Sequence, residues 1–174
     1  NLGVGATTRE GLRWALDHGF DAALLIDADG QHDPEEASRF VQRFEEKHEA
    51  LTIGARDYGK IPLRRRLPNL FSRLVLSAIF GEFLPDNQCG YRLLDRRMIE
   101  AFLETHEAGY NFAIEMMIVC RENGWEIGWV PISTIYGDEV SKQTAWYQIV
   151  GFTRMSLLAL RRLRMSQRQG KDSA

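Results

Sequence analysis

Residues 22–34 read Ala-Ala-Leu-Leu-Ile-Asp-Ala-Asp-Gly-Gln-His-Asp-Pro, and the fold class follows from this run. Its first five residues are apolar on both alternating faces, which is typical of a strand in a parallel sheet that helices cover on both sides. Two carboxylates, Asp27 and Asp29, come directly after it, at the edge where α/β proteins bind ligands. Asp33 and Pro34 then supply the cap and the first position of a helix. The run therefore predicts a strand, an acidic loop and a helix.

The segments on either side continue this alternation. We expect helices at residues 7–18, 68–80, 111–123 and 144–168, and extended segments at 51–54 and 125–135. Residues 58–68 are basic and contain proline, so they predict a loop, and residues 81–92 are rich in turn formers. Together the pattern predicts an α/β fold with an open, mainly parallel sheet flanked by helices.

The composition indicates one ordinary globular domain. The 174 residues are 44% hydrophobic and 26% charged, and the net charge of −2 gives no global field that would attract nucleic acid. Cys89 and Cys120 match no metal-ligand spacing and suit a reducing cytoplasm. No apolar run is long enough to predict a membrane-spanning helix. The chain does not begin with methionine and opens like the middle of a domain, so we expect it to be a fragment.

The chemistry of the acidic loop points to a divalent cation. Carboxylates spaced as Asp27 and Asp29 are suit Mg²⁺ or Mn²⁺, which keep coordination positions open for phosphate oxygens. Such an ion would act as a Lewis acid on a leaving diphosphate. The alternative is that the two aspartates only cap the turn before the helix at Pro34.

Five ordered motifs resemble one known family over nearly the whole chain. The sequence is similar to the family 2 glycosyltransferases, in the dolichol-phosphate-mannose-synthase-like branch. The motifs are Asn-x-Gly-x-Gly at 1–5, the Asp-Ala-Asp-Gly-Gln-His-Asp-Pro run at 27–34, Gly-Ala-Arg at 54–56, Asp-x-Gln-Cys-Gly-Tyr-Arg at 86–92 and Tyr-Gly-Asp-Glu-x-Ser-Lys at 136–142.

This resemblance implies a GT-A fold, here a truncated Rossmann-like nucleotide-sugar domain without its first base-binding strands. It also implies a metal-dependent, inverting transfer of a hexose from a nucleotide-diphosphate sugar, commonly onto a polyprenyl phosphate. The implied site residues are the metal ligands Asp27, Asp29 and Gln31, the substrate-binding residues Ala28, Arg56, Gly90, Tyr91 and Lys142, and the catalytic residues Asp86 and Arg92.

The acceptor decides which of these groups the chemistry needs. A phosphate monoester is already largely anionic at neutral pH, because its second pKa is about 6. Holding two repelling anions together is then the harder task, for which Arg92, Lys142 and the run Arg64-Arg65-Arg66 are suitable counter-ions. If the acceptor is a hydroxyl instead, Asp86 is the best candidate for a general base.

Residues 144–174 are expected to form an amphipathic basic helix after a partial catalytic domain at 1–143. Apolar residues between 149 and 160 precede Arg161, Arg162, Arg164 and Arg168. Such a helix suits peripheral contact with anionic lipid on the cytoplasmic face of a membrane. Packing on a partner or on the rest of the domain is the alternative.

Three other functions compete with the glycosyltransferase prediction. The Leu-Leu-Ile-Asp-x-Asp-Gly run also looks like the nucleophile strand of a haloacid-dehalogenase-like phosphatase, but Gln31 stands where that chemistry normally has a hydroxyl residue. A Ca²⁺ loop fits less well, because the glycine falls at the wrong position. A non-catalytic relic that binds nucleotide sugars is the third alternative.

Overall fold

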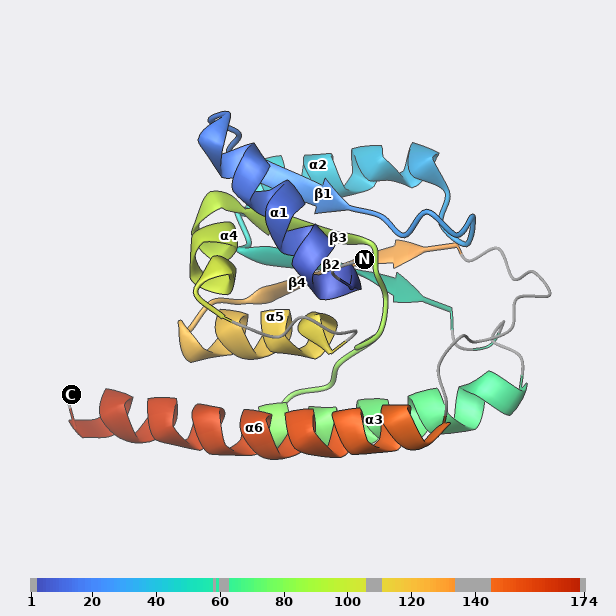
Figure 1. The fold of residues 1–174 in the computed structure, drawn as a ribbon, viewed down its shortest axis with the longest axis vertical. Helices are drawn as coiled ribbons and strands as arrows, with labels where there is room; N and C mark the ends of the chain where they lie inside the picture. The colour runs from blue at the N-terminus through green and yellow to red at the C-terminus, as the bar shows by residue number, and fades with distance from the viewer. Residues whose placement is uncertain (1–2, 58, 60–62, 106–110, 134–144, 173–174) are drawn as a thin grey trace.

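The computed structural model describes residues 3–57, 59, 63–105, 111–133 and 145–172. Helices surround a small central sheet, and two long helices form a further layer on one side (Figure 1). The elements are α1 (Val4–Asp17), β1 (Ala22–Leu25), the 3₁₀ turn η1 (Pro34–Glu36), α2 (Ala37–Lys47), β2 (Leu51–Arg56), α3 (Leu63–Phe80), β3 (Arg92–Asp95), α4 (Arg96–Leu103), α5 (Phe112–Glu122), β4 (Ile127–Ile132) and α6 (Ala145–Asp172).

The sheet is open and mixed, with the strand order β1-β3-β2-β4. β2 and β4 are parallel neighbours, whereas β3 lies antiparallel between β1 and β2, with Leu93 opposite both Leu24 and Thr52. The expected α/β fold is confirmed, and three of the four described strands share one direction. The reversed strand was not foreseen, because Arg92 was taken as the end of a connection. Its reversal brings the start of β3 to the edge where β1, β2 and β4 end.

The acidic loop and the helix after it form as the sequence predicts. Pro34 opens η1, and the Asp33 carboxylate accepts a hydrogen bond from the backbone N–H of Glu35 at 2.9 Å. This bond satisfies a donor that a helix start otherwise leaves unpaired. The chain then continues into α2, whose Phe40 is fully buried against the sheet. The acidic loop is therefore held between a strand and a capped helix.

Helix α3 starts earlier than predicted. It begins at Leu63 and contains Pro68, which the sequence analysis placed at the start of the helix. A proline near a helix start removes a single intrahelical bond, and the surrounding apolar periodicity is enough to continue the helix. Arg64–Arg66 consequently lie in the first turn of α3, not in a loop. Helix α4 was not predicted; its N-cap is Asp95, which accepts from the N–H of Met98 at 2.7 Å.

Helix α6 packs on the rest of the molecule along α5 and α3 (Figure 1). Its 28 residues span about 42 Å at the usual rise per residue. Met155 and Ala159 are fully buried, and the guanidinium of Arg162 forms a two-pronged ion pair with Glu122 of α5. Among the described residues, no helix is both long and apolar enough to cross a membrane.

Candidate active site

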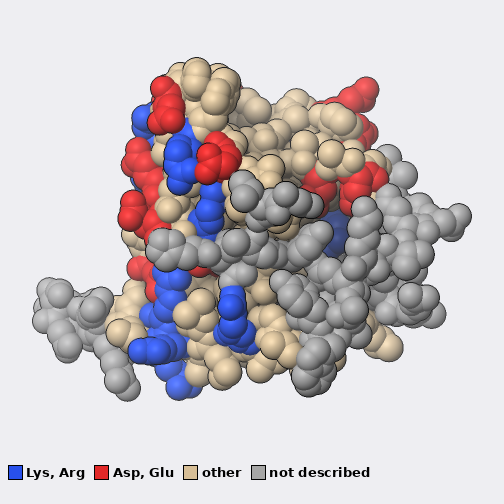
Figure 2. Space-filling view, in the orientation of Figure 1, with Lys and Arg blue, Asp and Glu red and all other residues tan. Residues whose placement is uncertain are grey.

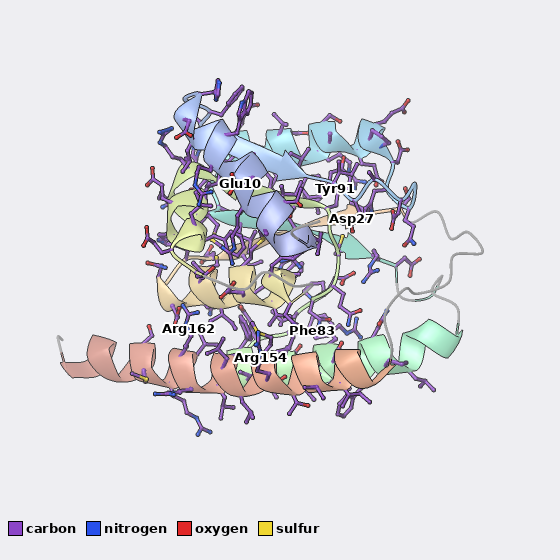
Figure 3. All side chains as sticks on the ribbon, viewed as in Figure 1. Glu10, Asp27, Phe83, Tyr91, Arg154 and Arg162 are labelled. Atoms are coloured by element: carbon purple, nitrogen blue, oxygen red, sulfur yellow. The ribbon has the colours of Figure 1, made fainter. Side chains whose placement is uncertain are left out.

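The predicted site residues gather at one edge of the sheet. Asp27 follows β1 by one residue, Arg56 ends β2, and Arg92 begins the reversed strand β3. Figure 3 labels Asp27 and Tyr91 at this edge. The electrostatic neighbours of His32 include Asp27, Arg56 and Asp86, so two loops and the end of β2 contribute charged groups to one small region.

Gly90 allows the acidic loop and the 86–92 connection to touch. A Cβ atom built on Gly90 would lie 2.0 Å from Oδ2 of Asp27 and 2.3 Å from its Cγ. No side chain fits in that space, because real Cβ contacts are much longer. The predicted substrate-binding role of Gly90 stays a prediction. What the geometry gives is a steric reason for glycine: it lets the Asp27 carboxylate lie on the backbone of the second loop.

The acidic loop presents oxygen atoms that suit a divalent cation. Asp27 and Asp29 are exposed, and one oxygen of Asp29 accepts from the backbone N–H of Gln31 at 3.0 Å. That bond is the turn-capping contact of the simpler alternative, and for Asp27 no such turn bond is found among the described residues. Within these residues no cluster of three or more His, Cys, Asp or Glu could hold a metal. Two carboxylates and the Gln31 amide still fit Mg²⁺ or Mn²⁺, which commonly complete their coordination with substrate phosphates and water.

The buried side chain of His32 packs against the acidic loop. Its ring is buried, lies 5.4 Å from the ring of Tyr91, and places Nε2 3.9 Å from Oδ2 of Asp27. Burial lowers the pKa of His32, although the carboxylates of Asp27 and Asp29 act in the opposite direction. Nδ1 is buried and has no hydrogen-bond partner in the part of the chain that the structure describes. A neutral imidazole that packs on Tyr91 is the state that this environment favours.

Tyr91 is part of the core under the site. Its side chain is fully buried, stacks on Phe40 with ring centroids 4.4 Å apart, and donates a hydrogen bond to the carbonyl of Asp33 at 3.4 Å. The sequence analysis expected Tyr91 to bind substrate. That role stays a prediction; the contacts of Tyr91 in the structure hold the start of β3 against the acidic loop.

Arg56 and Asp86 form a buried, two-pronged ion pair. Nε and Nη2 of Arg56 donate to the two carboxylate oxygens of Asp86 at 2.6 and 3.0 Å. Oδ1 of Asp86 also accepts from the backbone N–H groups of Gln88 at 2.9 Å and Cys89 at 3.2 Å. Asp86 is 0% exposed. Because these donors engage both oxygens of the carboxylate, the geometry favours a role in holding Arg56 over a role as a general base.

Arg92 lies beneath the 86–92 connection and supports its backbone. The guanidinium donates to the carbonyls of Cys89 at 2.8 Å, Ala113 at 2.5 Å and Asn87 at 3.5 Å. The residue is 0% exposed, and burial lowers its pKa to about 10. A cation in this position cannot touch an acceptor unless the loop moves. Its contacts are those of a positioning residue that ties the loop to α5.

Of the remaining predicted site residues, the structure describes only some. Ala28 is exposed in the acidic loop, as a residue that lines a donor site through its backbone needs to be. Lys142, with the whole motif at 136–142, lies outside the described residues. Sequence reasoning missed the backbone donors of Gln88 and Cys89, since no side-chain pattern signals that a loop will fold around a carboxylate.

An open α/β sheet with charged groups at the carboxyl ends of its strands is the arrangement in which α/β domains commonly bind ligands. Residues 1–114 match the family described as Glycosyl transferase family 2. The chain belongs to this family, which confirms the resemblance seen in the sequence.

Several proteins similar to this chain have names that point to one branch of the family. The chain is 30% identical to a UDP-N-acetylglucosamine--dolichyl-phosphate N-acetylglucosaminyltransferase of Methanococcus voltae, over 87% of this chain and 62% of that protein. It is 29% identical to an undecaprenyl-phosphate mannosyltransferase of Micrococcus luteus, over 90% and 68% of the two chains. A polyprenol monophosphomannose synthase of Mycolicibacterium smegmatis is 32% identical, over 75% and 52%. These names agree with the dolichol-phosphate-mannose-synthase-like branch. The chain spans 62% of the length of the first of these relatives.

Proposed function

We propose that this chain is the catalytic part of a glycosyltransferase that moves a hexose from a nucleotide-diphosphate sugar to a polyprenyl phosphate. The observation that carries the proposal is the juxtaposition of an acidic loop, at Asp27 and Asp29, with a preorganised cation, Arg56, at one edge of the sheet. Relatives named for dolichyl, undecaprenyl and polyprenol phosphate support the choice of acceptor. The matches lend no support to the phosphatase or to the binding relic.

The reaction we propose is a single displacement. An acceptor phosphate oxygen bonds to the anomeric carbon from the side opposite the diphosphate. The bond from that carbon to the diphosphate oxygen breaks, and its electron pair stays on the nucleoside diphosphate. Attack from the opposite side inverts the configuration, and an acceptor that is already anionic releases no proton.

The chain's own residues would bind and neutralise the charged groups of this step. Asp27, Asp29 and Gln31 would hold a Mg²⁺ or Mn²⁺ ion, which would neutralise charge on the leaving diphosphate. Arg56 would attract the acceptor phosphate, and the ion pair with Asp86 fixes the plane of its guanidinium before any ligand arrives. A fixed cation stabilises charge without reorganising during the reaction, which is the effective form of electrostatic catalysis.

We place the enzyme in the cytoplasm, peripherally on a membrane surface. Large apolar side chains are exposed on α3 at Leu67, Phe71 and Leu74, and on α6 at Ile149 and Leu157. Arg161 and Arg164 of α6 are also exposed, and Figure 2 shows basic side chains gathered over the later part of this helix. An apolar helix surface bordered by arginines suits the interface of an anionic membrane, where a lipid-linked acceptor resides.

A transfer assay tests this proposal. The protein, expressed from its complete reading frame, is incubated with a panel of labelled nucleotide sugars, undecaprenyl or dolichyl phosphate, and Mg²⁺, Mn²⁺ or EDTA. We expect sugar in the lipid fraction, loss of transfer in EDTA, and an inverted anomeric configuration by NMR. Efficient transfer to water-soluble sugars with none to polyprenyl phosphate would exclude the acceptor. Full activity in EDTA would exclude the metal.

A further inference from the structure

We propose that Ser72 of α3 is a positioning residue that sets the Asp86–Arg56 ion pair and so couples the placement of α3 to the acceptor side of the site. The inference rests on the proposed function for its meaning in catalysis. Its structural basis is independent of that function: the Ser72 hydroxyl bonds the two residues that follow Asp86, beside a bond from Nη1 of Arg73 in the same helix to the carbonyl of Pro85 at 3.4 Å.

The hydroxyl of Ser72 is fully engaged. Ser72 is 5% exposed, and its Oγ accepts from Nδ2 of Asn87 and from Nε2 of Gln88, each at 3.3 Å. Its own proton goes to the carbonyl of Asn69 at 3.0 Å. A hydroxyl has one donor and two acceptor lone pairs, so these three bonds use its whole capacity. Because the proton is committed to Asn69, Oγ can only accept from the two amides, which fixes their orientation.

The backbone of the same two loop residues faces the site. The N–H of Gln88 donates to Oδ1 of Asp86 at 2.9 Å, and the carbonyl of Asn87 accepts from Arg92 at 3.5 Å. Asn87 is fully buried. Ser72 therefore forms hydrogen bonds with the side chains of Asn87 and Gln88, whereas Asp86 and Arg92 form hydrogen bonds with their backbone. A shift of the side-chain contacts must move the backbone that holds the Asp86 carboxylate, and with it the guanidinium of Arg56.

Helix α3 connects these hydrogen bonds to the surface of the molecule. Phe71, the residue before Ser72, is 64% exposed and belongs to the apolar surface that we propose lies on lipid. Successive helix residues point about 100° apart, so one helix can present Phe71 outward while Ser72 reaches the loop. Contact of α3 with the membrane would therefore fix the loop beside Arg56, at the side where the lipid phosphate arrives.

The chain offers a matched control for testing this inference. Ser77 lies on the same helix, and its hydroxyl accepts from the backbone N–H of Leu84 at 3.0 Å, on the same connection but away from Asp86. Ser72→Ala and Ser77→Ala each remove one hydroxyl from α3. We expect Ser72→Ala to raise the KM for polyprenyl phosphate about fivefold, which corresponds to about 1 kcal/mol, with the KM for the nucleotide sugar unchanged. Ser77→Ala should change neither.

Two further measurements keep the inference testable. Gln88→Met removes one of the two bonds from the loop side at an exposed residue, and it should raise the same KM in a way that is not additive with Ser72→Ala. Hydrogen exchange needs no activity: the amides of Gln88 and Cys89 should lose protection in Ser72→Ala and keep it in Ser77→Ala.

The outcomes separate this inference from the proposed function. Unchanged protection of Gln88 and Cys89 in Ser72→Ala overturns the positioning role, whatever the assay shows. An equal KM effect from Ser72→Ala and Ser77→Ala overturns it as well. If Ser72→Ala does not fold, an unchanged KM in Gln88→Met decides against it. A wild-type protein that transfers no sugar to polyprenyl phosphate refutes the proposed function, while the exchange result still decides whether Ser72 positions the loop.

Discussion

At the scale of single residues, the site depends on how closely the acidic loop packs on the backbone of the 86–92 connection. Gly90 is the clearest case, because the Asp27 carboxylate occupies the space that any side chain there would need. The 86–92 motif therefore includes a glycine for a steric reason. A substitution at this position should act on Asp27 without changing any charge.

We expect Gly90→Ala to displace the Asp27 carboxylate at a small cost in stability, because this carboxylate is the end of an exposed side chain that can turn away. Transfer activity should fall at the same time. The control is Gly11→Ala in α1, where an added Cβ meets nothing within 4 Å and should stabilise the helix by about 0.5–1 kcal/mol. Urea unfolding measures both. Wild-type transfer activity in Gly90→Ala would contradict a role for this contact in the site.

The two cysteines should be unreactive in the native protein. Burial raises the pKa of the Cys89 and Cys120 thiols to about 12. The thiolate is the reactive form, and raising the pKa lowers its population at any pH below that value, so at pH 8 only about one thiol in 10⁴ is ionised. A thiol reagent at pH 8 should label neither residue in the folded protein and both in urea. Rapid labelling of the native state would show that the core opens easily.

At the scale of elements, the order of helices and strands could largely be predicted, whereas the direction of one strand could not. The apolar run before Asp27 and the Asp33-Pro34 start are local signals, and both were confirmed. β3 is only four residues long, and nothing in Arg92–Asp95 tells whether it runs with or against its neighbours. Strand direction depends on long-range pairing, here with Ala22–Leu25 and Leu51–Ile53.

The same reasoning explains side-chain positions that the sequence does not reveal. The resemblance implies a catalytic role for Arg92, which stays a prediction, and arginine is usually exposed. Its burial follows from three carbonyls that converge only after β3 and α5 have packed. Likewise α6 looked like a separable tail, yet Met155 and Ala159 are buried against the domain. Deleting the helix would expose that surface, so its role at a membrane is better tested by surface substitutions.

We expect Phe71→Ser and Leu157→Ser to weaken binding to anionic vesicles, because each removes an exposed apolar side chain from α3 or α6. Arg161→Gln should remove about 1 kcal/mol of salt-sensitive affinity. Val41→Ser is the matched control: Val41 is also exposed, but it lies on α2, on the other side of the sheet. Vesicle sedimentation at low and high salt measures the effect. A loss of binding in Val41→Ser as large as in Phe71→Ser would argue against α3 as the docking surface.

At the scale of the whole molecule, the proposed function divides the edge of the sheet into a donor side at the acidic loop and an acceptor side at the Asp86–Arg56 pair. The acidic loop follows β1, and the Asp86–Arg56 pair joins the end of β2 to the loop before β3. The two sides meet where Asp27 lies on Gly90. Substitutions on the two sides should therefore be distinguishable when water competes with the lipid as the acceptor.

We expect Asp29→Asn to slow both transfer to polyprenyl phosphate and hydrolysis of the nucleotide sugar, since it removes a charged ligand of the proposed metal. A loss of about 3 kcal/mol of transition-state stabilisation corresponds to roughly a hundredfold slower reaction.

Asp86→Asn should act differently, because it releases Arg56 and leaves the acidic loop intact. Transfer should fall through a higher KM for the lipid, while hydrolysis continues near the wild-type rate. Asp17→Asn, at the exposed end of α1, is the control for the loss of one carboxylate charge. Equal loss of hydrolysis in Asp29→Asn and Asp86→Asn would show that both loops serve the donor, and the acceptor side would then have to be sought elsewhere on the molecule.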